Sequence, residues 1–240
     1  MKLVTYSRGE GSRTAALVHG NSMSHDIWRE FADILIRDHD LSLVLVDLRG
    51  HGRSPRAKSY AIKEFAQDLV DTLPTDLDFL IGHSLGGVVS ALAAPSLRPR
   101  HYIGLDPAFD ITLAKGLVLL LVGPHQSRLP GWFLGLLGQP PAGAPPDTME
   151  RFRASWRNWD SGMMWHFTRE SRPLIPAGPP AVPSTLVLAD KSFVVSKAMA
   201  RSLEAAGWDV RVKPGAVHDL QVQDPEGLAA LLADVLLKRE

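Results

Sequence analysis

The chain has 240 residues, of which 45% are hydrophobic and 22% are charged, as in an average globular domain. Its 26 basic and 26 acidic side chains balance, so no excess of charge points to nucleic acid or to an anionic membrane surface. The absence of cysteine excludes disulfide bonds, thiolate metal sites and a cysteine nucleophile.

The beginning of the chain lacks the long apolar stretch of a secretory signal. The most apolar run, residues 116–123, is far too short to span a bilayer. We therefore expect a soluble, cytoplasmic protein that binds neither nucleic acid nor membrane.

Short apolar runs alternate with amphipathic segments along most of the chain. A further short strand is predicted at 210–213, and the apolar runs themselves predict strands at 14–18, 42–46, 78–81, 101–105 and 185–189. Their nearly continuous hydrophobicity is typical of strands that are buried on both faces of a parallel sheet. The segments between the runs predict helices at 27–37, 62–73, 85–94, 196–206 and 227–238. This alternation indicates an α/β fold with a doubly wound, mostly parallel sheet.

The alternation stops in a proline-rich stretch between about residues 107 and 183. Further helices are predicted there at 113–121, 132–137 and 149–167. We predict two parts, which are a core made of residues 1–107 and 184–240 and a helical cap inserted at 108–183.

The sequence Gly-His-Ser-Leu-Gly-Gly at residues 82–87 directly follows a predicted strand and opens a predicted helix. This is the G-x-S-x-G pattern in the strand–turn–helix context that exposes a serine on a sharp turn. Ser84 is therefore the predicted nucleophile, and the neighbouring His83 is expected to point away from it and pack. The alternative is an ordinary βα turn in which a serine happens to lie between glycines.

Residues 19–22 (His-Gly-Asn-Ser) follow the first predicted strand. In acyl-transfer enzymes the loop at this place supplies one backbone N–H to the oxyanion hole, and the residue after the nucleophile supplies the other. We assign these two roles to Asn21 and Leu85, with Ser22 or Met23 as the alternatives to Asn21.

His218 lies between the last predicted strand and the last predicted helix. A histidine on such a late loop can reach a serine at the carboxyl edge of the sheet, so His218 is the predicted base. The loop at 47–54 (DLRGHGRS) also follows a strand but suggests no catalytic task. Its Asp47, Arg49 and His51 are expected to hold the loop in place.

The segments HGNS, DLRGHGRS, GHSLGG and GAVHD, in this order, resemble the α/β-hydrolase superfamily. The resemblance covers about residues 1–107 and 184–240. It implies a mostly parallel sheet, a Ser-His-acid triad and no cofactor or metal. It also implies a cap at 108–183 that shapes the substrate pocket.

The acid of the triad departs from this pattern. In most of the superfamily the acid follows the strand after the cap, where this chain has Ser192, which cannot ionise. Asp190 lies two residues earlier and is the alternative acid. Asp106 is favoured, because certain dehalogenases and lactone hydrolases of the superfamily look similar in placing the acid there. Asp110 and Asp219 stay open.

The predicted reaction is acyl transfer to water from an ester, thioester or lactone. The apolar and aromatic residues of the predicted cap indicate a small apolar or aromatic acyl substrate. Hydrolysis of carbon–carbon bonds in diketo acids and low-turnover ligand binding are the alternatives. Serine at 84 argues against dehalogenase and epoxide hydrolase activity, because those members of the fold use aspartate as nucleophile. A homodimer is left open.

Overall fold

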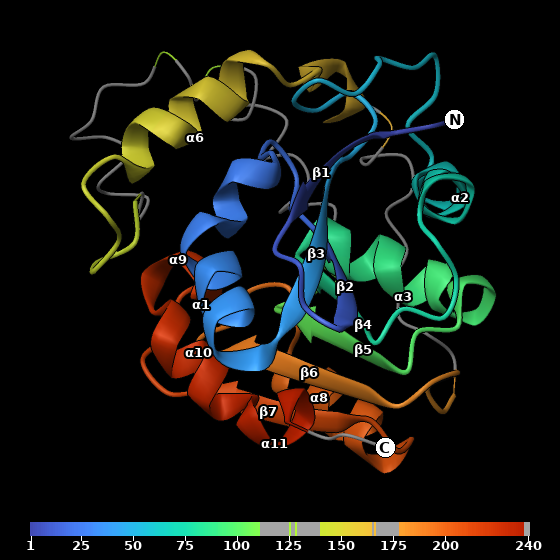
Figure 1. Cartoon of the computed structure of the whole chain (residues 1–240), viewed down its shortest axis with the longest axis vertical. Coiled ribbons are helices and arrows are strands. Elements are labelled where there is room, and N and C mark those ends of the chain that lie inside the picture. Colours follow the sequence, from blue (N-terminus) through green and yellow to red (C-terminus); the bar gives the residue numbers. More distant parts are fainter. Residues whose placement is uncertain (111–124, 126–127, 129–139, 165, 167–177, 238–240) are drawn as a thin grey trace.

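The protein is built around one seven-stranded sheet, seen in the computed structural model (Figure 1). The structure describes residues 1–110, 125, 128, 140–164, 166 and 178–237. The strands lie in the order β1-β3-β2-β4-β5-β6-β7. Strand β1 runs antiparallel to β3, and the other pairs are parallel. This arrangement confirms the predicted doubly wound, mostly parallel α/β fold.

All six predicted strands are present, each with bounds within two residues of the prediction. The seven strands of the sheet are β1 (Val4–Arg8), β2 (Arg13–Val18), β3 (Leu41–Asp47), β4 (Phe79–His83), β5 (His101–Leu105), β6 (Ser184–Ala189) and β7 (Asp209–Lys213). Strand β1 was not predicted. It is an edge strand in which half-buried and exposed residues alternate, so it lacks the apolar run that marks the inner strands.

Helices cover both faces of the sheet. One face carries α1 (Arg29–His39), α9 (Leu220–Gln223), α10 (Pro225–Leu231) and α11 (Ala233–Leu236), and the other carries α2 (Ile62–Thr72), α3 (Leu85–Leu97) and α8 (Lys197–Ala205). The last predicted helix is divided in two, because Leu232 leaves helical geometry with φ −100° and ψ 2°. Asp224 caps the start of α10, where its side chain accepts a hydrogen bond from the Gly227 N–H at 2.9 Å.

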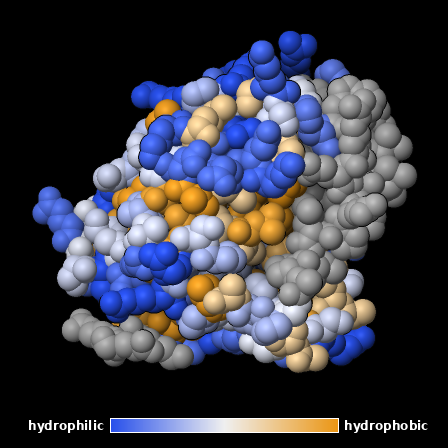
Figure 2. All heavy atoms as spheres, turned by 90° about the vertical axis from the view of Figure 1, so that its right-hand side faces the viewer, coloured by the Kyte–Doolittle hydropathy of each residue, from blue (hydrophilic) through white to orange (hydrophobic). Residues whose placement is uncertain are grey.

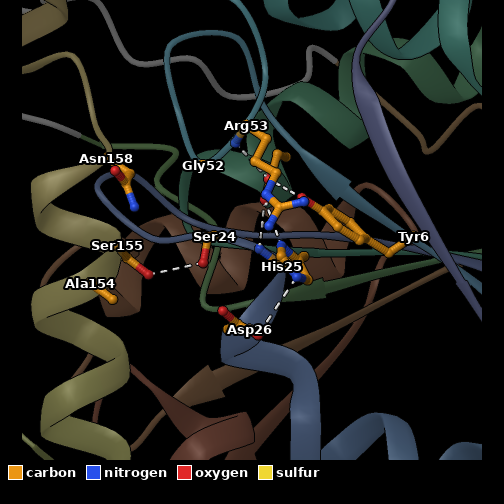
Figure 3. A pocket seen from close by; sticks show the side chains of 10 residues that line it. Tyr6, Ser24, His25, Asp26, Gly52, Arg53, Ala154, Ser155 and Asn158 are labelled. Atoms are coloured by element: carbon orange, nitrogen blue, oxygen red, sulfur yellow. Dashed lines mark hydrogen bonds and ion pairs between the residues drawn. The ribbon is translucent and has the colours of Figure 1, made fainter.

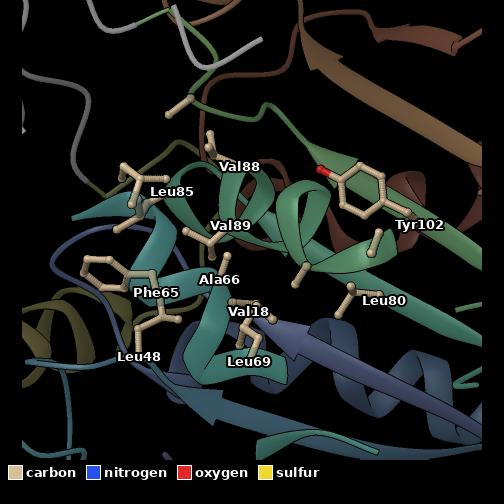
Figure 4. Packing of buried hydrophobic residues seen from close by; sticks show 14 of the residues in the cluster. Val18, Leu48, Phe65, Ala66, Leu69, Leu80, Leu85, Val88, Val89 and Tyr102 are labelled. Atoms are coloured by element: carbon tan, nitrogen blue, oxygen red, sulfur yellow. The ribbon is translucent and has the colours of Figure 1, made fainter. Parts of the chain in front are cut away.

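The core consists of two hydrophobic clusters, one on each face of the sheet. Figure 4 shows the cluster in which α3 packs between the sheet and α2. Helix α3 is apolar nearly all round, which is typical of a helix buried on several sides. This packing fixes the helix that follows the predicted nucleophile. The right-hand side of Figure 1, where α2 and α3 lie, carries an apolar band bordered by polar surface (Figure 2).

Helix α6 (Thr148–Arg157) lies against the short helix η1 (His25–Trp28) and the start of α1. Arg151 of α6 forms an ion pair with Glu30 at 2.8 Å and donates to the Asp26 carbonyl at 2.9 Å. Phe152 and Trp156 enter the cluster on the same face. Helix α6 is therefore anchored to the core by both polar and apolar contacts.

The predicted helix 149–167 is shorter than expected, because α6 ends at Arg157 and a 3-10 turn, η3 (Ser161–Met163), follows. The Asp160 carboxylate accepts a hydrogen bond from the Gly162 N–H at 3.0 Å, which favours a turn over a continued helix. The predicted helices 113–121 and 132–137 lie outside the described residues, so the boundaries of the cap remain a prediction. Within the described part, no helix has the length and hydrophobicity needed to cross a lipid bilayer.

Candidate active site

Ser84 lies on the sharp turn between β4 and α3, with φ +52° and ψ −116°. This conformation is costly for a residue with a side chain and persists only where the surroundings enforce it. The Ser84 N–H donates to the Leu105 carbonyl at 3.0 Å. The Ser84 carbonyl accepts from the N–H groups of Val88 at 3.2 Å and Ala108 at 3.0 Å. The turn is thus bonded to β5 and to its own helix.

The glycines around Ser84 are needed because the turn leaves no room for side chains. A Cβ at Gly82 would lie 2.4 Å from the Gly86 carbonyl oxygen. A Cβ at Gly86 would lie 2.2 Å from the carbonyl oxygen of Val18, at the end of β2. The G-x-S-x-G pattern therefore lets α3 begin directly against the end of β2.

Three side chains from different loops meet at the carboxyl edge of the sheet. The Oγ of Ser84 lies 2.9 Å from Nε2 of His218, and Nδ1 of His218 lies 2.7 Å from Oδ2 of Asp106. The Asp106 side chain is fully buried, whereas that of His218 is 20% exposed. A histidine that donates from Nδ1 to a carboxylate presents an unprotonated Nε2 to the serine hydroxyl. This is the arrangement of nucleophile, base and acid in a serine hydrolase.

The surroundings of Asp106 hold its carboxylate in position. Its Oδ1 accepts a hydrogen bond from the Ala189 N–H at 3.3 Å, and its own N–H donates to the Val187 carbonyl at 2.8 Å. Burial lowers the pKa of His218, but the hydrogen bond and negative charge of Asp106 outweigh burial, so the pKa of His218 is raised above 6.5.

The other candidate acids make different contacts. Asp190 accepts a hydrogen bond from the Gly215 N–H at 3.3 Å, and the Asp219 carboxylate lies 3.7 Å from Nε2 of His83. The N–H of Asp110 donates to the Val194 carbonyl. At the position where most of the superfamily has the acid, Ser192 accepts from the N–H of Val195 at 2.9 Å and so stabilises its own loop.

The loop after β2 lies directly against the nucleophile. A Cβ at Gly20 would lie 3.1 Å from Cβ of Ser84. In this loop the Ser22 N–H donates to Nε2 of His51 at 3.0 Å, and the Met23 N–H donates to the Gly20 carbonyl at 3.4 Å. The two alternatives to Asn21 are therefore already occupied.

The backbone N–H groups of Asn21 and Leu85 have no hydrogen-bond acceptor in the part of the chain that the structure describes. The Leu85 amide opens α3, where the first N–H groups of a helix have no partner within it. The Asn21 side chain donates to Sδ of Met164 at 3.5 Å and thus lies beside the 140–164 segment. Among the described residues, neither predicted donor of the oxyanion hole is therefore committed to an acceptor.

His83 is buried and packed as predicted, but its ring lies against His218 and does not point away from the site. Its Nε2–H donates to the His218 carbonyl at 2.9 Å, and the two rings are 4.8 Å apart. On another side the ring of Phe193 lies 4.7 Å from His218. Burial and the charge of His218 lower the pKa of His83 to about 4, so it stays neutral at neutral pH. The sequence contains no local signal for this contact, because the two histidines are 135 positions apart.

The loop at 47–54 is held in the way expected of a structural element. The buried Asp47 carboxylate accepts hydrogen bonds from the backbone N–H groups of His25 and Arg53, both at 2.9 Å. Burial alone would raise the pKa of Asp47. The hydrogen bonds that its carboxylate accepts from the His25 ring and from backbone N–H groups have a larger effect in the opposite direction, so this pKa lies well below its usual range. Arg49 forms a buried ion pair with Asp68.

A separate cavity of about 280 Å³ lies between this loop, η1 and α6 (Figure 3). Residues with polar side chains predominate among those that line it, which are Tyr6, Ser24, His25, Asp26, Asp47, Gly52, Arg53, Ala154, Ser155 and Asn158. The hydroxyls of Ser24 and Ser155 are hydrogen-bonded across it at 2.9 Å. None of the three side chains centred on Ser84 lines it, so it is distinct from the candidate active site.

The seven-stranded sheet and the contacts between Ser84, His218 and Asp106 are typical of the α/β-hydrolase fold. The model of the alpha/beta hydrolase family matches residues 16–231, and the chain belongs to this family. The structure of a Bacillus megaterium epoxide hydrolase superposes with a TM-score of 0.78 over 98% of this chain and 97% of that chain, at 18% identity. At this identity the likeness concerns the fold alone.

Two curated relatives match part of the chain. Esterase YbfF of Escherichia coli (strain K12) is 45% identical over 97 residues, which are 38% of this chain and 37% of the relative. The pimeloyl-[acyl-carrier protein] methyl ester esterase of Edwardsiella ictaluri is 34% identical over 117 residues, which are 47% of this chain and 44% of the relative. The matches therefore span less than half the length of these relatives.

Proposed function

We propose that the protein is a serine hydrolase that cleaves a carboxylic ester, thioester or lactone of a small apolar molecule. The observation that carries this proposal is the continuous hydrogen-bonded series from Asp106 through His218 to Ser84, at 2.7 and 2.9 Å. Nucleophile, base and acid within hydrogen-bond distance are what covalent acyl transfer requires.

Each residue has a defined task in this reaction. His218 Nε2 takes the proton of Ser84 as Oγ attacks the carbonyl carbon, and Asp106 stabilises the imidazolium that forms. The N–H groups of Asn21 and Leu85 donate to the oxyanion, which is usually the largest single contribution to catalysis. His218 then protonates the leaving group, and a water molecule repeats the sequence to release the acid and free Ser84.

The relatives and the surroundings of Asn21 support an ester substrate. Both curated relatives described above are esterases, and one acts on a methyl ester. Met164, which contacts Asn21, brings an apolar side chain next to the proposed oxyanion hole. The alternative of a low-turnover ligand-binding protein rested on the displaced acid, and the contact between Asp106 and His218 supports turnover instead.

The test is hydrolysis of p-nitrophenyl esters from acetate to decanoate and of alkyl methyl esters, together with labelling by a fluorophosphonate. We expect turnover and a label on Ser84. Ser84→Ala should abolish labelling and lower kcat by about 10⁵–10⁶-fold, because loss of the nucleophile removes the covalent route. The melting temperature of the variant should stay close to that of the unmodified protein.

The matched control is Ser90→Ala. Ser90 is a fully buried serine on the same helix, and its hydroxyl has no partner among the described residues, so its removal should leave kcat unchanged. Hydrolysis by Ser84→Ala at the normal rate would refute the assignment of the nucleophile. Absence of both turnover and labelling in the unmodified protein would refute the proposed function.

A further inference from the structure

His51 is a fully buried histidine to which the proposed chemistry gives no task. Its Nε2 accepts a hydrogen bond from the Ser22 N–H at 3.0 Å, and its Nδ1–H donates to the Arg49 carbonyl at 2.9 Å. A ring nitrogen that accepts from an N–H carries no proton itself. The two contacts therefore fix the neutral ring in the form protonated at Nδ1.

Ser22 needs this contact because its backbone is strained. With φ +60° it lies in the left-handed region, which is unfavourable for a residue with a side chain. The hydrogen bond to His51 opposes relaxation of this strain. The amide that precedes Ser22 along the chain belongs to Asn21, the proposed donor to the oxyanion.

His19 makes a second connection between the same two loops. Its Nδ1–H donates to the Gly20 carbonyl at 2.7 Å, and its Nε2 accepts from the Leu48 N–H at 3.1 Å. The rings of His19 and His51 are 5.0 Å apart and nearly edge to face. Two imidazoles in the same protonation form thus join the loop at 19–23 to the loop at 47–51.

Protonation of either ring at Nε2 would break its connection between the loops. A protonated Nε2 cannot accept a hydrogen bond and would repel the backbone N–H group of Ser22 or Leu48. Burial is the main cause that lowers the pKa of both rings, and it brings the pKa of His51 to about 3. Both rings therefore remain neutral acceptors at the pH at which His218 acts as a base.

On this geometry, and resting on the proposed function, we propose that His51 is a positioning residue of the oxyanion hole. Its Nε2 holds the strained Ser22 amide and thereby aims the adjacent Asn21 N–H at the oxyanion beside Ser84. The histidine of the DLRGHGRS segment then contributes to catalysis through the loop that it holds, without touching the substrate.

The kinetic test compares His51→Phe, which keeps an aromatic ring but removes the acceptor, with His51→Gln, whose Oε1 can accept from Ser22. A misplaced donor should lower kcat of p-nitrophenyl butyrate hydrolysis by about 10- to 100-fold in His51→Phe while KM changes little. Binding of 1,1,1-trifluoroheptan-2-one, whose adduct with serine carries an oxyanion, should weaken by a similar factor. His51→Gln should recover part of both losses.

The control for loss of a buried histidine is His39→Phe. His39 ends α1 just before β3 begins, and β3 places it about 20 Å from the carboxyl edge of the sheet. Its Nδ1 has no partner among the described residues. Normal kcat in His51→Phe, an equal loss in His39→Phe, or a loss of kcat with unchanged ketone binding would overturn the role of His51.

Nuclear magnetic resonance of the unmodified protein tests the hydrogen bond itself, independently of activity. Nitrogen shifts of the His51 ring should show a protonated Nδ1 and a bare Nε2 that do not titrate between pH 5 and 8. A coupling across the hydrogen bond should connect Nε2 with the Ser22 amide. A protonated Nε2 would overturn the inference even if His51→Phe failed to fold. If the unmodified protein hydrolysed no ester but showed this coupling, the proposed function alone would have failed.

Discussion

Asp106 is fully buried, and its two carboxylate oxygens have different partners. Oδ2 accepts from His218, and Oδ1 accepts from a backbone N–H. The residue also has φ +40°, so the backbone conformation that aims it is itself strained. Such a carboxylate is held in place before any substrate arrives, which favours catalysis over a merely structural role.

Asp106→Asn should therefore lower kcat by about 10³–10⁴-fold, because the amide cannot stabilise the imidazolium and favours the wrong protonation form of the ring. Asp190→Asn is the matched control, since its carboxylate accepts from the Gly215 N–H and should affect kcat less than about tenfold. Steady-state kinetics on one p-nitrophenyl ester decides between them. A larger loss of kcat in Asp190→Asn than in Asp106→Asn would instead identify Asp190, in the loop after β6, as the acid of the triad.

The pH dependence should report His218. A base must be neutral to accept a proton, and Asp106 raises the pKa of His218 above its ordinary value of 6.5. The value of kcat/KM should therefore rise with pH through an apparent pKa above 6.5. In Asp106→Asn the raising charge is gone, so the same limb should move to lower pH as kcat falls. If this limb of the kcat/KM profile does not move in Asp106→Asn, its apparent pKa belongs to a group other than His218.

At the scale of elements, the end of β2 and the start of α3 approach each other so closely that only glycine fits between them. A Cβ at Gly20 would lie 2.9 Å from Nδ1 of His83 and 3.1 Å from Cβ of Ser84. His83 in turn holds the backbone of His218. The loop of the proposed oxyanion hole, the nucleophile turn and the loop of the base therefore form one packed unit.

Gly20→Ala should displace the loop after β2 from the nucleophile. We expect kcat to fall by about 10- to 100-fold with a smaller change in KM, because a small misplacement of the oxyanion donor is costly. Gly162→Ala is the control, since its new Cβ would meet the Asp160 carboxylate at 3.1 Å, in a turn outside the three loops that carry Ser84, His218 and Asp106. Steady-state kinetics and thermal melts of both variants distinguish a loss of catalysis from a loss of stability. Equal kcat in both variants would show that the close approach has no catalytic consequence.

At the scale of the whole molecule, Arg49 joins the loop after β3 to α2. Its side chain is 8% exposed and forms an ion pair with the buried Asp68 and another with Glu64 at 2.7 Å. Without Arg49, the buried Asp68 carboxylate would keep, among the described residues, only the Met1 amino group as a cationic partner. This contact therefore stabilises the fold from a place outside the triad.

Arg49→Ala should lower the free energy of unfolding by about 3 kcal/mol, the lower end for a broken buried pair, because Met1 still pairs with Asp68, while kcat per folded molecule changes little. Urea unfolding measures this loss. Arg100→Ala is the control, because Arg100 is 66% exposed and its ion pair with Asp78 is long at 3.7 Å. Such a surface pair contributes about 1 kcal/mol or less. Equal losses in the two variants would contradict a stabilising role of the buried pair.

The prediction from sequence was reliable where a local pattern carries the information. The apolar runs located the inner strands, and the glycines on either side of Ser84 marked the nucleophile turn. It failed for β1, whose alternating edge pattern is weak, and for the end of α6, where a local turn at Asp160 replaced the helix. The catalytic roles assigned to the site remain predictions.

The sequence by itself determined the class of fold and the side chains that can act as nucleophile, base or acid, because periodicity and turn chemistry are local properties. The tertiary structure decided which of these side chains meet. His218 is 134 positions from Ser84 and 112 from Asp106, and only the order of the parallel strands brings their carboxyl ends to one edge. The contact of His83 with His218 and the hold of His51 on Ser22 depend on the same packing, so no local pattern could predict them.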